Sequence, residues 1–231
     1  MPEAKWLAAT TLYELNLPRN TKGQHRKWRL LAAAWCRRAV TLAVPDPRLI
    51  QLLQAAEGFA DGTMDADELK QARKVLTAIR QEVGTDHFGP LEALSNAAKA
   101  LDFATHSNPV KPLSANESCY FAFAALTRKS KKRKAWEQAI EAEQAVQLRL
   151  ARCIFGNPFR PVPFPKKWRT ESAVSLARTA YGTHNFALLP ILADALEEAG
   201  CDHPDTLTHL RAPTAPHARG CWVVDLVLGK A

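Results

Sequence analysis

Hydrophobic residues along this chain recur mainly at steps of three and four, the spacing that places them on one face of an α-helix. The clearest case is residues 27–43, where Trp28, Leu31, Trp35 and Ala39 form one apolar stripe. No stretch shows sustained alternation of hydrophobic and polar residues, which is the pattern of a half-buried β-strand. The sequence therefore predicts an all-α fold, a multi-helix array of antiparallel helix pairs with about eight to ten helices.

Start and stop signals divide the first eighty or so residues into helices. After the helix over 27–43, a second is expected over 46–58, closed by the glycine at its end. A third begins at Asp65, because Glu68 stands three positions later as in a capping box. It is expected to continue to residue 83, which also ends an N-terminal helical unit over residues 1–83.

The rest of the chain divides into a variable segment, residues 84–134, and a C-terminal helical unit, residues 135–231. Four prolines between residues 158 and 165 exclude both a helix interior and a central strand there, so this stretch should cross the surface. The helices expected in these two parts cover residues 91–105, 114–126, 135–153, 170–181, 186–199, 202–211 and 217–228, where the last could instead be a strand. Thr170 and Asp202 are expected to cap the helices that follow them, and the helix over 135–153 is expected to pack through its alanine-rich face.

The positive charge of the chain is concentrated in one short run. The 231 residues are 47% hydrophobic, enough for a buried core, and carry a formal net charge of +8. Six basic residues lie within residues 128–134, and without them the excess of basic over acidic residues falls to two. This run indicates either a solvated loop or a salt-sensitive contact with nucleic acid phosphates. Its basic residues are Arg128, Lys129, Lys131, Lys132, Arg133 and Lys134.

The five cysteines are odd in number and irregularly spaced, and the first residues lack the basic and apolar regions of a signal peptide. No apolar run approaches the roughly 18 residues of a membrane-spanning helix. We therefore expect reduced thiols, a cytoplasmic protein and no membrane span.

A group of metal-ligating residues follows residue 200. Cys201, His209, His217 and Cys221 offer the thiolates and imidazoles that zinc accepts. On one helix, His217 and Cys221 would share a face. Their spacing does not match a compact zinc knuckle, however, and buried thiols with loop-bound histidines are the competing interpretation. The sequence thus predicts no cofactor and no stoichiometric zinc, with zinc as the alternative.

Motifs of established enzyme classes do not occur: there is no phosphate-binding loop, dinucleotide-binding glycine pattern, nucleophile elbow or paired-histidine zinc motif. Cys36 lies beside Arg37 and Arg38, but a buried structural thiol is expected there rather than a nucleophile. Asp194 and Glu197 are expected on a solvated helix face. The sequence predicts a protein that is not an enzyme.

Two motifs stand out: Phe-Gly-Asn-Pro-Phe-Arg-Pro at residues 155–161 and Arg-Gly-Cys-Trp at residues 219–222. With residues 5–10, 34–38, 59–62 and 189–197, they resemble a large paralogous family of bacterial proteins that has no established activity. Members of that family often carry a cysteine after the histidine that matches His209, where this chain has Leu210.

Each motif contributes one arginine, Arg160 and Arg219. Either could bind an anion or the carboxylate of a partner. The competing interpretation is structural: the arginines would bond helix carbonyls and stack on Phe159 or Trp222.

The preferred function from the sequence is a non-enzymatic helical module that binds a protein partner. The first alternative is a nucleic-acid-associated protein acting through residues 128–134. The second is a zinc-binding protein that uses the C-terminal cysteines and histidines.

Overall fold

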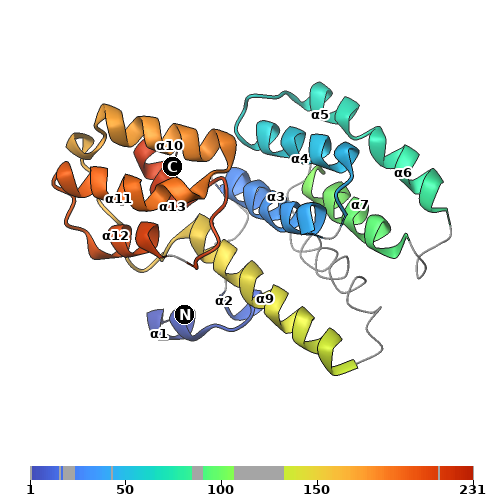
Figure 1. The fold of residues 1–231 in the computed structure, drawn as a ribbon, viewed down its shortest axis with the longest axis horizontal. Coiled ribbons are helices and arrows are strands. Elements are labelled where there is room, and N and C mark those ends of the chain that lie inside the picture. The colour runs from blue at the N-terminus through green and yellow to red at the C-terminus, as the bar shows by residue number, and fades with distance from the viewer. Residues whose placement is uncertain are drawn as a thin grey trace. The chain divides into compact units, whose positions relative to one another are not determined.

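A computed structural model describes residues 2–15, 17, 24–42, 44–84, 91–106, 133–212 and 214–230. These residues form helices joined by turns and extended segments, with no β-strand among them, which confirms the predicted all-α class (Figure 1). None of the described helices is both long enough and apolar enough to cross a membrane.

The chain forms two compact units, residues 1–148 and residues 149–231. The division falls inside a long helix, α9 (Arg133–Phe155), most of which was expected to belong to the unit over residues 135–231. We refer to the two parts as the N-terminal unit and the C-terminal unit.

Helix α3 forms the centre of the N-terminal unit, where it packs against α4 and α7 (Figure 1). Trp35 of α3 is fully buried, as predicted, and its indole Nε1 donates a hydrogen bond of 3.2 Å to the carbonyl oxygen of Gln147. The helices before α9 in this unit are α1 (Glu3–Ala8), α2 (Leu12–Leu15), α3 (His25–Leu42), α4 (Pro47–Ala60), α5 (Ala66–Ala72), α6 (Val75–Val83) and α7 (Glu92–Ala104).

Two arginines of α3 hold buried carboxylates. Arg37 binds Glu57 of α4 at 2.9 Å, and Arg38 binds both carboxylate oxygens of Glu143 of α9. Of the alanines expected on the packed face of α9, Ala135 and Ala139 are half-buried, whereas Ala142 is exposed and its neighbour Glu143 is buried. A carboxylate can be buried when a guanidinium forms hydrogen bonds with its oxygens, as Arg38 does with Glu143. The pattern of apolar residues alone therefore did not show which face of α9 is buried.

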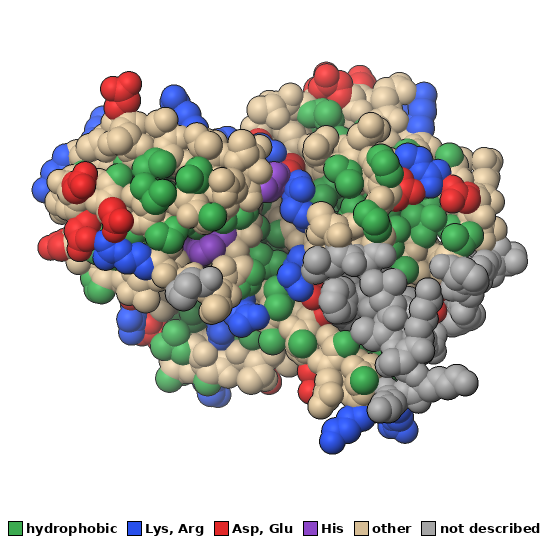
Figure 2. All heavy atoms as spheres, in the orientation of Figure 1, with side chains coloured by type: hydrophobic (Ala, Val, Ile, Leu, Met, Phe, Trp, Pro, Cys, Tyr) green, Lys and Arg blue, Asp and Glu red, His purple; other side chains and the backbone are tan. Residues whose placement is uncertain are grey.

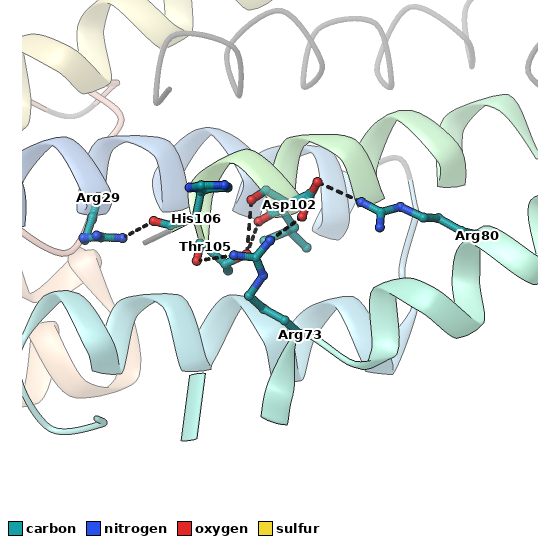
Figure 3. A network of polar contacts seen from close by, with 7 residues as sticks. Arg29, Arg73, Arg80, Asp102, Thr105 and His106 are labelled. Atoms are coloured by element: carbon teal, nitrogen blue, oxygen red, sulfur yellow. Dashed lines mark hydrogen bonds and ion pairs between the residues drawn. The ribbon is translucent and has the colours of Figure 1, made fainter. Parts of the chain in front are cut away.

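A second polar network holds the C-terminal end of α7 (Figure 3). Arg73 and Arg80 each donate to one carboxylate oxygen of Asp102, at 2.6 and 2.8 Å. Arg73 also donates to the carbonyl of Thr105, and Arg29 of α3 donates to the carbonyl of His106. Positive charge at carbonyls left unpaired where a helix ends is favourable.

Two helix boundaries in the N-terminal unit differ from the sequence-based expectation. The second expected helix continues to Ala60, so Gly58 lies inside it and does not end it. The chain turns after the helix, at Gly62, whose φ is +71°. The third expected helix is interrupted at Arg73 and Lys74, where no glycine or proline marks a break. Its predicted capping box is confirmed, since the Asp65 and Glu68 side chains bind each other's backbone amides.

The C-terminal unit contains the end of α9, and in it α11 packs against α10 and α12 while α10 also packs against α13 (Figure 1). Residues 156–165 are non-helical, as their prolines predict. Thr170 caps α10 through the backbone amide of Ala173, as predicted. The helical elements after α9 are η2 (Lys166–Trp168), α10 (Glu171–Thr183), η3 (Phe186–Leu188), α11 (Leu189–Glu198), α12 (Pro204–Arg211) and α13 (Trp222–Leu228).

Two expectations in this unit were wrong. Helix α12 begins at Pro204 and its N-cap residue is His203, so Asp202 does not cap this helix. The last helix begins at Trp222 and not at residue 217. The chain turns just before it, where the amide of Cys221 bonds the carbonyl of Ala218 at 3.0 Å and the intervening Gly220 has a φ of +85°.

Candidate metal centre

Four metal-ligating side chains meet inside the C-terminal unit. Cys153 lies near the C-terminal end of α9, His209 lies in α12, and His217 and Cys221 lie in the non-helical connection before α13. One donor atom from each residue can be chosen so that all four lie within 4.8 Å of one another. Three separate stretches of chain thus supply one compact donor set.

The separations of these donors match those around a single tetrahedral ion. Cys153 Sγ lies 3.6 Å from His217 Nδ1, and His209 Nε2 lies 3.2 Å from Cys221 Sγ. Zinc bonds of about 2.3 Å to sulfur and about 2.0 to 2.1 Å to nitrogen place tetrahedral sulfur and nitrogen ligands about 3.6 Å apart. The arrangement therefore needs only small adjustments to hold an ion at its centre.

Local backbone geometry explains why the donors converge. Gly156, with a φ of +66°, ends α9 soon after Cys153, and its amide bonds the carbonyl of Arg152 at 2.9 Å. The turn between Ala218 and Cys221 then brings the second thiol back toward the first. A left-handed φ is readily adopted by glycine and strained for other residues, so the turn at Gly156 suits this residue type.

Aromatic side chains fix the two imidazole rings. The rings of His209 and His217 meet edge to face with centroids 4.9 Å apart. Trp222 lies against His209 at 5.4 Å, and Phe186 lies near His217 at 6.2 Å. Both histidines are half-buried, whereas both cysteines are buried, so the sulfur side of the centre is the more enclosed.

The environment favours one thiolate even without a metal. Burial opposes a charge on Cys221, but the hydrogen bond with Cys153 and the proximity of His209 and His217 outweigh it, so the pKa of Cys221 is lowered well below its usual value. The pKa of Cys153 is raised, because it shares that hydrogen bond with Cys221 and is itself buried. The surroundings thus favour the thiolate form at Cys221 and the thiol form at Cys153, and binding of a divalent cation would favour loss of the proton from Cys153 as well.

A backbone amide also supports the sulfur of Cys153. The amide of Ala218 forms a hydrogen bond with this thiol group, which acts to lower its pKa. An amide directed at sulfur stabilises the thiolate over the thiol, the form in which cysteine binds metals.

Three of the four ligands suggested by the sequence, His209, His217 and Cys221, belong to this group, but Cys201 does not. Cys201 is buried just after α11, where it contributes to the hydrophobic core. Its place is taken by Cys153, which could not be recognised from spacing because it lies in α9, far along the chain from the donors beyond residue 200. The available signal was its position two residues before the Phe-Gly-Asn-Pro-Phe turn, at the end of a helix.

The two motif arginines have different surroundings. Arg160 is exposed, and its guanidinium lies 3.8 Å from the carboxylate of Asp205. The guanidinium carbon of Arg219 lies 4.7 Å from the ring centroid of Tyr181. The sequence led us to expect that Arg219 stacks on an aromatic ring, but the ring expected was that of Trp222 and the ring observed is that of Tyr181. Sequence reasoning also missed Arg169, whose Nε donates to the carbonyl of Leu226 near the end of α13.

The basic run is described only at its end. Arg128, Lys129, Lys131 and Lys132 lie outside the described residues, whereas Arg133 and Lys134 begin α9 and are exposed. Arg133 pairs with Glu137 at 2.8 Å. On the face shown in Figure 2, acidic and basic side chains are interspersed.

Cys36, Asp194 and Glu197 have the surroundings that the sequence predicted. Cys36 is fully buried in α3, as expected of a structural thiol. The carboxylates of Asp194 and Glu197 are exposed, as expected, and both accept a hydrogen bond of 2.6 Å from Arg211.

Comparisons of this chain with protein-family models, with curated proteins and with solved structures find no match. The resemblance to a family of bacterial proteins with the same two motifs therefore stays a prediction.

Proposed function

We propose that this chain is a zinc-binding helical protein in which one zinc ion, held by Cys153, His209, His217 and Cys221, stabilises the C-terminal unit. The observation that carries the proposal is the convergence of two thiols and two imidazoles from three separate segments, with donor atoms within 4.8 Å. It reverses the expectation of no zinc that irregular spacing in the sequence suggested.

Zinc fits this donor set better than other common ions. Calcium and magnesium prefer oxygen ligands, whereas mixed sulfur and nitrogen ligands in a tetrahedral arrangement are typical of zinc. Two thiolates also balance the charge of a divalent ion. The loaded centre would be neutral, which lowers the cost of burying it.

The proposed role of the ion is structural. Catalytic zinc sites keep one coordination position for water or substrate, whereas here the protein supplies four ligands. The ion would tie the end of α9 to α12 and to the connection before α13. Because such a site rarely exists in an unfolded chain, the binding energy would contribute directly to folding.

This role is compatible with the protein-binding module inferred from the sequence, since a structural ion stabilises a surface without adding chemistry to it. Arg160 and the basic run remain candidates for contacts with an acidic partner or with nucleic acid, and both stay predictions.

The test is metal analysis of untagged protein produced with zinc in the medium. We expect one zinc per chain, and replacement by Co²⁺ should give the intense visible absorption of tetrahedral cobalt together with a thiolate charge-transfer band. Cys153→Ser and Cys221→Ser should each lose the metal and lower the melting temperature of the C-terminal unit.

Cys201→Ser is the matched control, because Cys201 is equally buried but lies outside the donor group. Metal retained in Cys153→Ser but lost in Cys201→Ser would support the ligand set suggested by the sequence. A chain without zinc under these conditions would contradict the proposal.

A further inference from the structure

The two sulfur donors of the proposed zinc site lie where they could bond to each other. The Sγ atoms of Cys153 and Cys221 lie within 4.8 Å and share a hydrogen bond. Among the described cysteines, Cys36 and Cys201 lie outside this group. The site therefore contains one pair of neighbouring thiols, and this pair supplies both of its anionic ligands.

We infer that Cys153 and Cys221 form a redox switch: a peroxide oxidises them to a disulfide and releases the zinc, and a dithiol reductant restores the binding site. The inference rests on the proposed zinc site and adds its regulation.

The chemistry balances with hydrogen peroxide as the oxidant. One thiolate attacks a peroxide oxygen, the O–O bond breaks, and a sulfenic acid and hydroxide form. The second thiolate attacks the sulfenic sulfur, the S–O bond breaks, and a disulfide and a second hydroxide form. Two protons convert the hydroxides to water. Two electrons thus pass from the two sulfurs to one peroxide molecule.

Oxidation would remove both charged ligands at once. A disulfide carries no negative charge, so only the imidazoles of His209 and His217 would remain, and two neutral ligands do not make a structural zinc site. The disulfide would close a loop containing α10, α11 and α12. The disulfide joins two of the three segments that the metal connects, the end of α9 and the residues just before α13, so we expect the C-terminal unit to stay folded when zinc leaves.

The burial of the site favours a small oxidant. Cys153 is 2% exposed and Cys221 is 0% exposed, and the partly exposed groups of the site are its histidines. Thiol oxidation depends on access as well as on thiolate character. Hydrogen peroxide should therefore react faster than a bulky disulfide such as oxidised glutathione.

The experiment uses the zinc-loaded full chain and hydrogen peroxide. Released zinc is followed with a colorimetric chelator, disulfides are located by peptide mapping without reduction, and helix content is followed by circular dichroism. We expect zinc release to parallel formation of a Cys153–Cys221 disulfide while helix content is retained. Dithiothreitol and added zinc should reverse both changes. Oxidised glutathione should act roughly tenfold more slowly.

The Cys201→Ser variant should respond like the natural chain, which would exclude pairing through Cys201. Zinc release accompanied by sulfinic acid at both cysteines, by a disulfide to Cys201 or by loss of the helical signal would overturn the inference. So would zinc retention at peroxide concentrations that oxidise exposed thiols. In each of these cases the zinc site itself would stand, whereas a chain that binds no zinc would overturn both proposals.

Discussion

Gly156 lies directly against the indole of Trp222, so closely that a Cβ atom at residue 156 would be 3.2 Å from Cγ of that ring. Trp222 in turn packs on His209, one of the four proposed ligands. The motif at residues 155–161 and the motif at residues 219–222, far apart in the sequence, thus meet beside the proposed zinc ligands. This contact explains, without any catalytic role, why a glycine stands in the first motif and a tryptophan in the second.

We expect Gly156→Ala to destabilise the C-terminal unit and to weaken zinc binding. A left-handed φ costs a non-glycine residue about 1 kcal/mol or more, and the added methyl group would displace Trp222 and with it His209. Gly200→Ala is the control: its φ is +84°, but a Cβ there meets nothing within 4 Å. Urea unfolding and zinc titration of both variants would measure the difference. Equal effects of the two substitutions would show that the contact with Trp222 is unimportant.

We expect Trp35→Ala to lower the free energy of unfolding by about 3 to 5 kcal/mol, because the ring is fully buried and its loss leaves a large cavity. Trp35→Phe should cost less, since it fills much of that volume and loses mainly the hydrogen bond to the Gln147 carbonyl. Denaturant titration would measure both. An unchanged midpoint for Trp35→Ala would place this side chain outside the core.

Asp46 should contribute a pH-dependent part of the stability of α4. Its side chain accepts from the amide of Arg48 at the helix start, and hydrogen bonding to the Arg48 guanidinium lowers the pKa of Asp46. Because the folded pKa lies below the unfolded value of about 3.9, this stabilisation is present above pH 3.9 and is lost as the pH falls through the folded pKa.

Asp46→Asn keeps an oxygen at the helix start and removes the charge. We expect it to cost roughly 0.5 kcal/mol at pH 7, after allowance for solvent screening of this partly exposed pair. The difference between the two proteins should shrink as the pH falls below the unfolded pKa of about 3.9, and should disappear once the pH is below the folded pKa of Asp46. Thermal unfolding at several pH values would measure it, and a difference that is constant with pH would contradict the ionic contribution.

Replacing the six basic residues within residues 128–134 by serine should leave the melting temperature nearly unchanged, since Arg133 and Lys134 are exposed. If the run binds nucleic acid, the same change should remove that affinity together with its salt dependence. Fluorescence polarisation with single-stranded DNA at two salt concentrations would measure this. If the serine variant binds as tightly as the natural chain, nucleic acid must contact residues outside this run.

Local signals in the sequence identified most of the described helices after residue 24, but not α1 or α2, and the helix expected over 114–126 lies outside the described residues. The stripe around Trp35, the capping box of Asp65 and Glu68, and the cap at Thr170 each depend on residues within one or two helical turns, and all three are confirmed. The break at Arg73 was missed because no residue at the break has a low helix propensity. Its side chain is instead bound to Asp102 and Thr105, far away in the sequence.

The four candidate metal ligands could be identified only in part from the sequence, because some of them are distant from one another along the chain. His209, His217 and Cys221 are near one another in the sequence and could be recognised as a group. Cys153 comes from the preceding long helix, and no spacing rule connects it to them. Cys201 was closer in sequence, but the end of α11 places it in the hydrophobic core.

Because the division between the two units falls inside α9, this chain is not a pair of modules that recombination could exchange at the basic run. A junction at residue 134 would deprive the N-terminal unit of Glu143, the carboxylate that Arg38 binds, and of Gln147, the acceptor for Trp35. A new C-terminal half would have to bring equivalent residues with it. We therefore expect chimeras of related chains to fold when they are joined after residue 148, and to fail more often when they are joined before α9.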